Sequence, residues 1–332
     1  MKKDSVTARR QFLACATWLC AMPKAAAQPL GTNPAGPLRI LCTAPGGTVP
    51  DIVARRYAEL LGAAHPGGII VDNRAGAGGR IAVAALKQAA PDGATLLLAQ
   101  AAVTTVYPYL YETLAYDPVS DLKPVSVAAE AALALAVGPA VPDSVTDLPR
   151  LIDWIRQNPS KASHGSPGVG TLPHLMIALL ARDAKVDWQH VPYPGGPPAL
   201  VDLMAGRLAA LALPEGLLRP HLAAGKLRVL ATSGPTRSSF LPQVASVVEQ
   251  GFPRLVMREW FAFFAPPGTP AAVVDGLSAS LQRAAQHLGL RNALGDAGML
   301  ALASTPAELR ERIALEQPYW RGVISATGVR AE

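Results

Sequence analysis

Four glycine-rich turns carry the chemistry that this sequence suggests, because glycine lets a ligand approach the main-chain amides closely. They span residues 44–48, 75–79, 165–171 and 193–196, and each precedes a segment with helical or apolar character. The start of a helix presents unpaired N–H groups and about half a positive charge. The pattern therefore predicts binding of an anion.

The size of the helix-end effect limits this prediction. One helix start contributes about 0.3 to 1 kcal/mol toward an exposed anion and up to ~2 kcal/mol toward a partly buried one. Micromolar binding needs about 8 kcal/mol, so the turns must share a closed cleft with little water. In such a cleft Thr48, Ser166 and Thr171 add charge-assisted hydrogen bonds. For any one turn taken singly, the alternative that glycine only reverses the chain stays open.

Other motifs argue against a catalytic or metal centre. Gly165, Gly168 and Gly170 lack the spacing of a dinucleotide site, and no Lys-Ser/Thr pair completes a phosphate loop. Ser166 does not stand in a Gly-x-Ser-x-Gly elbow, and the six histidines lack zinc-helix spacing. We expect no cofactor, no metal and no enzymatic activity. His174 is expected to cap or pack, and Glu215 to be a solvated loop residue.

The elements that must position these turns alternate between short apolar runs and segments of helical period, which is typical of β/α units on parallel sheets. Strands are predicted at residues 38–43, 68–72, 95–99, 188–191 and 227–232. Two longer apolar segments bounded by proline, 125–139 and 255–267, are predicted to cross between two lobes. The first lobe is then residues 37–128 plus 258–332, and the second is residues 129–257. An amphipathic tail, 305–322, is expected to pack on the first lobe.

The amino terminus has the pattern of an export signal. A basic start with Arg9-Arg10, an apolar stretch over 12–22 and three alanines ending at Ala27 predict cleavage after Ala27 and fit a twin-arginine leader. The full chain has a net charge of +6, and the leader accounts for +4 of it, so the mature chain carries a net charge of +2. With this small charge no nucleic-acid partner is expected. Cys15 and Cys20 also lie in the leader, which leaves Cys42 without a partner for a disulfide.

Taken in order, several short motifs resemble one known family, the substrate-binding receptors of tripartite tricarboxylate transporters, called Bug receptors. No single motif is specific, but the ordered set is, and it covers nearly the whole mature chain. It comprises Ala-Pro-Gly-Gly at 44–47, Val-Asp-Asn-Arg-Ala-Gly-Ala-Gly-Gly at 71–79, Pro-Asp-Gly at 91–93, Tyr-Asp-Pro at 116–118, Gly-Ser at 165–166 followed by His174, His-Val-Pro-Tyr at 190–193, Ala-Gly-Lys-Leu-Arg at 224–228 and Ala-Pro-Pro-Gly-Thr-Pro at 265–270.

The resemblance implies an α/β fold of the two-lobed periplasmic binding protein type II, in which each lobe is a mostly parallel sheet flanked by helices and two strands cross between the lobes. It implies a monomeric receptor in the periplasm that closes on a small organic acid, typically a di- or tricarboxylate, and delivers it to membrane permease subunits. Two alternatives stay open: a periplasmic ligand sensor for a membrane signalling protein, and an exported cofactor-dependent α/β enzyme. The ligand contacts carried over from the family are Pro45, Gly46, Gly47, Thr48, Gln100, Ser166, Gly168, Gly170, Thr171, Tyr193 and Gly195.

Overall fold

One ten-stranded sheet connects the whole molecule, in the order β2-β1-β3-β9-β4-β7-β5-β6, with β8 and β10 both paired to β4. The computed structural model describes residues 36–63 and 65–331. The predicted leader, its cleavage after Ala27 and the two leader cysteines lie outside the described residues. Within them, no helix combines the length and hydropathy needed to cross a bilayer.

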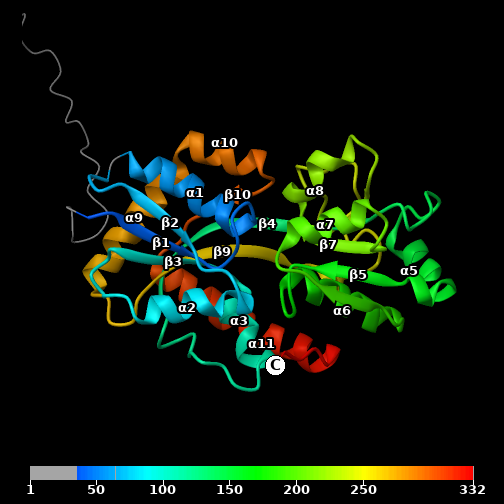
Figure 1. Ribbon diagram of the computed structural model, residues 1–332, viewed down its shortest axis with the longest axis horizontal. Helices are drawn as coiled ribbons and strands as arrows, with labels where there is room; N and C mark the ends of the chain where they lie inside the picture. Colours follow the sequence, from blue (N-terminus) through cyan, green and yellow to red (C-terminus); the bar gives the residue numbers. More distant parts are fainter. Residues whose placement is uncertain (1–35, 64, 332) are drawn as a thin grey trace, which may run out of the picture.

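The first lobe is built on three parallel strands. These are β1 (Leu38–Cys42), β2 (Ile69–Asn73) and β3 (Thr95–Gln100), close to the predicted positions. Buried side chains on the two faces of this sheet belong to different hydrophobic clusters, so helices cover both faces (Figure 1). One face is covered by α1 (Val49–Gly62), α9 (Ala271–Gln286) and α10 (Leu288–Asp296); the other by α2 (Arg80–Lys87), α3 (Ala102–Thr105), α4 (Tyr107–Leu110) and α11 (Pro306–Thr327).

Two antiparallel strands connect the lobes, as the sequence predicted. The longer one, β4 (Lys123–Val137), pairs with β9 (Arg258–Ala265) as far as Ala132 and with β7 and β8 from Leu133 onward. The change of partner therefore lies beyond residue 128, where the sequence-based division ended the first part of lobe one. The short strand β10 (Leu300–Ala301) also pairs with β4.

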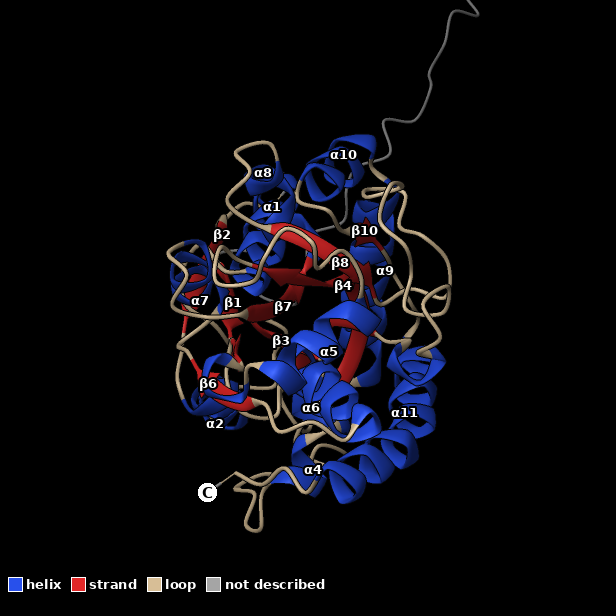
Figure 2. Cartoon of the chain, turned by 90° about the vertical axis from the view of Figure 1, so that its right-hand side faces the viewer, coloured by secondary structure: helices blue, strands red, loops and turns tan. Residues whose placement is uncertain are grey.

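The second lobe repeats the parallel arrangement. Its strands are β5 (Ser163–Ser166), β6 (Gln189–Pro192), β7 (Ala210–Pro214) and β8 (Arg228–Thr232), and its helices are α5 (Leu148–Gln157), α6 (Leu172–Ala184), α7 (Gly196–Met204) and α8 (Glu215–Leu222). The helices surround the strands when the molecule is viewed from this end (Figure 2). Three single-turn 3₁₀ helices complete the described elements: η1 (Ala77–Gly79), η2 (Pro159–Lys161) and η3 (Pro253–Leu255).

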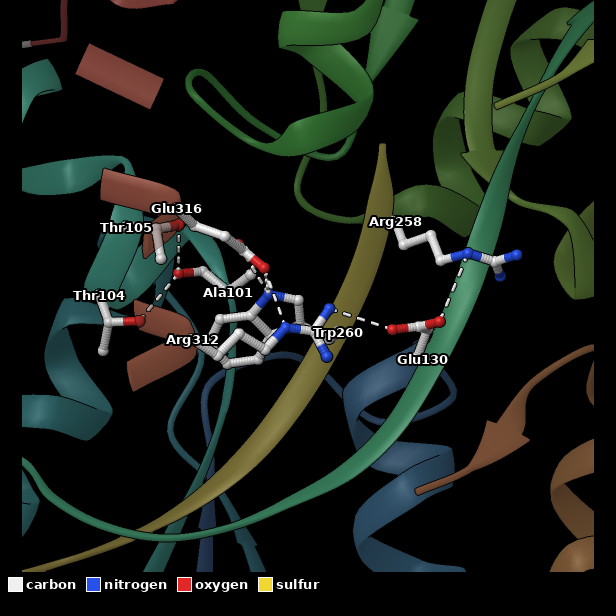
Figure 3. A network of polar contacts seen from close by, with 8 residues as sticks. All are labelled: Ala101, Thr104, Thr105, Glu130, Arg258, Trp260, Arg312 and Glu316. Carbon is white, nitrogen blue, oxygen red and sulfur yellow. Dashed lines mark hydrogen bonds and ion pairs between the residues drawn. The ribbon is translucent and has the colours of Figure 1, made fainter. Parts of the chain in front are cut away.

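The carboxyl-terminal helix α11 ties the crossing strands to the body of the protein. It contacts β4 and α3, as expected for a tail on the first lobe, and it also contacts α6 of the second lobe. Arg312 of α11 donates to Glu130 of β4 (3.0 Å) and to Glu316 (2.9 Å), and Glu316 accepts from the Trp260 indole of β9 (2.9 Å) (Figure 3). Arg258 pairs with the other oxygen of Glu130 at 3.4 Å. The point where the lobes join is therefore fixed by a network of charges.

Candidate functional site

A cavity with a volume of about 530 Å³ lies between the two lobes. It is bordered by loops that follow the carboxyl ends of β1, β2, β3, β5, β6 and β7, where ligands of open α/β sheets usually bind. All four glycine-rich turns reach it, from both lobes. Its walls include Thr43, Pro45, Thr48, Ala75, Gly76, Ala77, Gly78, Gly79, Gln100, Tyr111, Pro167, Gly168, Val169, Thr171, Tyr193, Gly195, Gly196, Leu213, Leu217, Glu259 and Phe261.

The turn between β1 and α1 is rigid and contributes only part of its length to the cavity. Pro45 and Thr48 line it, but Gly46 and Gly47 do not. The Gly47 amide is used internally, because it donates to Asp51 Oδ2 at 2.9 Å. Thr48 Oγ1 likewise donates to the Pro45 carbonyl at 2.6 Å. Of the four ligand contacts predicted in this turn, only Pro45 and Thr48 therefore line the cavity.

Asp51 holds the turn and does not line the cavity. Its two oxygens accept from Gly47, Arg55 and Asn73 at 2.9 Å each. Burial by itself would raise the pKa of this carboxyl, but the hydrogen bonds from Arg55, Gly47 and Asn73 outweigh it and hold the pKa below its usual value. Asp51 is thus an ionised clamp that connects α1 to β2.

The turn between β2 and α2 has the most unusual backbone of the site. Four consecutive residues have positive φ: Gly76 (115°), Ala77 (47°), Gly78 (67°) and Gly79 (95°). Only glycine adopts this region without strain, so Ala77 stores some strain. A Cβ at Gly78 would lie 2.7 Å from Tyr107 Oη, and one at Gly79 would lie 2.8 Å from Thr43 Cβ. The positive φ angles and the close packing both require glycine at Gly78 and Gly79.

Gln100 fastens this turn to the end of β1. Its Oε1 accepts from Thr43 Oγ1 at 2.6 Å, and its Nε2 donates to the Gly78 carbonyl at 3.0 Å. Tyr107, which is fully buried, donates to the same carbonyl at 2.9 Å. Gln100 therefore lines the cavity as predicted and also positions the turn.

The second lobe brings four of its six predicted contacts to the cavity. Gly168, Thr171, Tyr193 and Gly195 line it, whereas Ser166 and Gly170 do not. Ser166 is completely buried, and its hydroxyl lies 2.7 Å from His190 Nε2. Its burial leaves no access for a substrate to a Ser166 nucleophile.

Gly170 faces the other lobe, because a Cβ there would lie 2.0 Å from Leu110 Cδ2 of α4. The lobes meet closely at two further glycines. A Cβ at Gly195 would lie 3.3 Å from Thr48 Cγ2, and one at Gly216 would lie 1.6 Å from the Ala297 carbonyl. The structure is therefore that of the lobes in close contact around the cavity.

Three histidines stack beneath the second-lobe turns. The ring centroids of His174 and His190 are 3.7 Å apart, and those of His164 and His190 are 5.0 Å apart. His174 Nδ1 accepts from the Gly170 amide at 3.1 Å, which confirms the predicted capping role. Burial lowers the pKa of His174 to about 3 and that of His190 to about 4, so both rings are neutral at pH 7. No group of three or more possible metal ligands occurs in the described part of the chain.

Hydrogen-bond donors remain available on the cavity walls, although fewer than the turns suggested. Prolines occupy the first turns of α1, α6 and α7, and proline has no N–H. The hydroxyls of Thr48 and Thr171 already donate to carbonyls, at 2.6 and 2.8 Å. Among the residues that line the cavity, Ala75, Gly76, Ala77, Gly78 and Val169 have main-chain amides that donate no hydrogen bond to another described residue.

Sequence reasoning did not identify two residues of β9 that form the cavity floor, Glu259 and Phe261. No lysine, arginine or histidine lines the cavity among residues 36–63 and 65–331. Within that part of the chain Glu259 is the only carboxyl group of the lining; it is 5% exposed, and its buried Oε1 has no hydrogen-bond partner there. The signal was available, since an acidic residue stands inside the predicted apolar crossing segment. The turn at 76–79 was recognised as glycine-rich but was not counted among the contacts.

Glu215 is not the solvated loop residue that the sequence predicted. It begins α8 and is 2% exposed, because the end of β7 and the start of α8 pack against the crossing strands. Burial raises the pKa of its carboxyl. Glu215 borders a second, smaller cavity of about 190 Å³ together with Glu130, Arg237 and Arg258, and it does not line the large cavity.

The chain is similar to proteins of one family over most of its length. The sequence profile described as "Tripartite tricarboxylate transporter family receptor" matches residues 53–329. Protein BugT of Bordetella pertussis is 32% identical over 300 residues, which cover 90% of this chain and 91% of BugT.

Two solved structures from Rhodopseudomonas palustris are similar in fold. Rpa4515 with adipate has a TM-score of 0.85 at 27% identity, covering 90% of this chain and 99% of that one. MatC with bound malate has a TM-score of 0.81 at 27% identity, covering 88% of this chain and all of the other, 100%.

Proposed function

Because the chain belongs to the tripartite tricarboxylate transporter receptor family and has the periplasmic binding protein-like fold, we propose that it captures a small carboxylate between its lobes and delivers it to membrane transporter subunits. One observation carries the proposal. Glycine-rich turns from both lobes, each at the start of a helix, line a single cavity.

The cavity suits an anion although no cationic side chain lines it. Free main-chain amides at residues 75–78 and 169 supply hydrogen-bond donors. The partial positive charge at the starts of α2 and α6 also stabilises an anion. These contacts are strong only when water is excluded, and closure of the lobes supplies that condition. Apolar walls from Leu213, Leu217 and Phe261 fit the carbon chain of an organic acid.

We propose a binding function without catalysis. The Ser166 hydroxyl is completely buried, and His190, whose Nε2 lies 2.7 Å from it, does not line the cavity. Of the eleven ligand contacts predicted from the sequence, we retain the seven that line the cavity. To these we add the turn at 76–79 and Glu259. The export route, a periplasmic location and a monomeric state belong to the same proposal.

The direct test is a thermal-shift and calorimetric screen with mono-, di- and tricarboxylates. A true ligand at a hundred times its Kd adds about 2.7 kcal/mol to the free energy of unfolding. The uncharged diamide of the same acid is the matched control, and it should produce no shift. If no member of a broad acid panel raises the melting temperature, or if the diamide stabilises equally, carboxylate capture is wrong. Delivery is tested separately, by uptake of the identified labelled acid in cells with and without this gene.

A further inference from the structure

Glu259 is a buried acid whose Oε1 finds no hydrogen-bond partner in the part of the chain that the structure describes. It is the second residue of β9, and its side chain lies on the same face as that of Phe261, two residues on, so both reach the cavity. It is 5% exposed, its Oε1 is completely buried, and that oxygen has no hydrogen-bond partner among residues 36–63 and 65–331. A buried polar group without a partner destabilises a fold, so its presence at a cavity indicates a partner that arrives from outside.

The charges around Glu259 do not favour its ionised form. Glu316 on α11 repels a negative charge there, and Tyr107 on α4 is the other titratable group that interacts with it. The nearby cations are occupied, because Arg258 pairs with Glu130 and Arg312 pairs with both Glu130 and Glu316 (Figure 3). Burial, assisted by Glu316, raises the pKa of Glu259 to about 8. The group is therefore mainly the neutral acid at pH 7, and a neutral carboxyl group is a hydrogen-bond donor.

We propose that Glu259 recognises the second carboxylate of a dicarboxylate ligand by donating its acid O–H to it, while the first carboxylate is held by the amides of the 75–79 turn. This inference rests on the proposed carboxylate-binding function and names the ligand class as dicarboxylate. It explains how a cavity without lysine, arginine or histidine can accept two negative charges. The O–H to carboxylate bond is a charge-assisted one, which is stronger than a neutral bond.

Binding of a dicarboxylate is coupled to protonation of Glu259. A bound carboxylate stabilises the protonated form of Glu259, so ligand and proton bind together. Near pH 7 the acid is already protonated, and binding takes up only about 0.1 proton; near pH 9, binding takes up about 0.9 proton. The affinity should fall about tenfold between pH 7 and pH 9. A ligand with an ammonium group would do the opposite, because it would ionise Glu259 and release about 0.9 proton at pH 7.

The experiment is titration calorimetry of the full chain with adipate, malate and succinate at pH 7 and pH 9. Each titration is run in two buffers of different ionisation enthalpy, which measures the number of protons exchanged. Hexanoate, which has the chain length of adipate but one carboxylate, is the matched ligand control and should exchange no proton. Uptake of about one proton at pH 9 with a dicarboxylate, together with tenfold weaker binding than at pH 7, supports the proposal.

Two variants complete the test. Glu259→Gln keeps an N–H donor at every pH, so it should retain binding, lose the proton uptake and abolish the tenfold pH effect. Glu259→Leu removes the donor and should weaken dicarboxylate binding at least tenfold at pH 7 while leaving hexanoate unaffected. Proton release at pH 7, or an unchanged pH profile in Glu259→Gln, overturns the role of Glu259 and leaves carboxylate capture intact. If wild type binds no carboxylate at any pH, the proposed function fails and this inference fails with it.

Discussion

Replacing Gly78 with alanine tests the turn that we place at the centre of the site. Gly78 has φ of 67°, and an added Cβ would lie 2.7 Å from Tyr107 Oη. Tyr107 is fully buried, so its hydroxyl moves aside only by giving up the 2.9 Å bond to the Gly78 carbonyl. The substitution therefore destabilises the fold in two independent ways, through backbone strain and through loss of the Tyr107 hydrogen bond.

The magnitude follows from these two contacts. Forcing alanine into the left-handed region costs about 1 to 2 kcal/mol. Losing the Tyr107 hydrogen bond adds about 0.5 to 1.5 kcal/mol. If the turn keeps its shape, the free energy of unfolding falls by about 1.5 to 3.5 kcal/mol. If the turn relaxes instead, the lost amide geometry weakens carboxylate binding by about 10- to 100-fold.

Gly46→Ala is the matched control, because a Cβ at Gly46 meets nothing within 4 Å and Gly46 does not line the cavity. Urea unfolding and calorimetry with the identified carboxylate measure both quantities for both variants. Gly46→Ala should resemble wild type in each. If Gly78→Ala also resembles wild type, or if Gly46→Ala weakens binding as strongly, the assignment of the 75–79 turn as the anion site is refuted.

The remaining predictions concern closure, the junction of the lobes and pH. Gly216→Ala places a Cβ 1.6 Å from the Ala297 carbonyl across the lobe contact, so small-angle scattering with ligand should give a larger radius of gyration than wild type, while Gly276→Ala, with open space around its Cβ, should not. Glu130→Gln should lower the free energy of unfolding by about 1 to 3 kcal/mol, because Glu130 pairs with Arg258 and Arg312, whereas Glu59→Gln at an exposed pair should change it by less than about 1 kcal/mol. The pKa of Asp51 is lowered in the folded protein, so the ionised carboxylate stabilises the fold above the ordinary aspartate pKa. This stabilisation is lost as the pH falls through the folded-state pKa. Wild type should therefore lose more stability than Asp51→Asn when the pH falls from 5 to 2.

The sequence predicted the architecture well because the signals for strands and crossing segments are local. Runs of apolar residues at 38–43 and 95–99 became β1 and β3, and the proline-bounded segments became β4 and β9. Strand β5 was not predicted, since Ser-His-Gly-Ser has no apolar run, although three of its four residues are buried. Its burial arises from packing against distant elements, which no short window contains.

The site was predicted in outline and missed in detail for a similar reason. Glycine-rich turns before helices can be recognised from sequence, and all four reach the cavity. Which amides remain free depends on tertiary contacts: Asp51 occupies Gly47, and His174 occupies Gly170. The proposed role of Glu259 depends on the strand face that β9 turns toward the cavity and on a lining that has no lysine, arginine or histidine among the described residues. Neither is encoded in neighbouring residues.

A cavity built from amides and a neutral acid links recognition to closure. When the lobes close, each donor that finds no acceptor remains buried and unpaired, which costs about 1 to 3 kcal/mol. Under our proposal, a ligand with one carboxylate would satisfy the donors at the 75–79 turn and leave Glu259 unpaired, whereas a dicarboxylate would satisfy both ends. Under the proposed function, a ligand of the correct chemistry and length would stabilise the arrangement seen here, in which a Cβ at Gly216 would lie 1.6 Å from the Ala297 carbonyl of the other lobe. If delivery to membrane transporter subunits takes place as we propose, those subunits could recognise the occupied state by this closed shape.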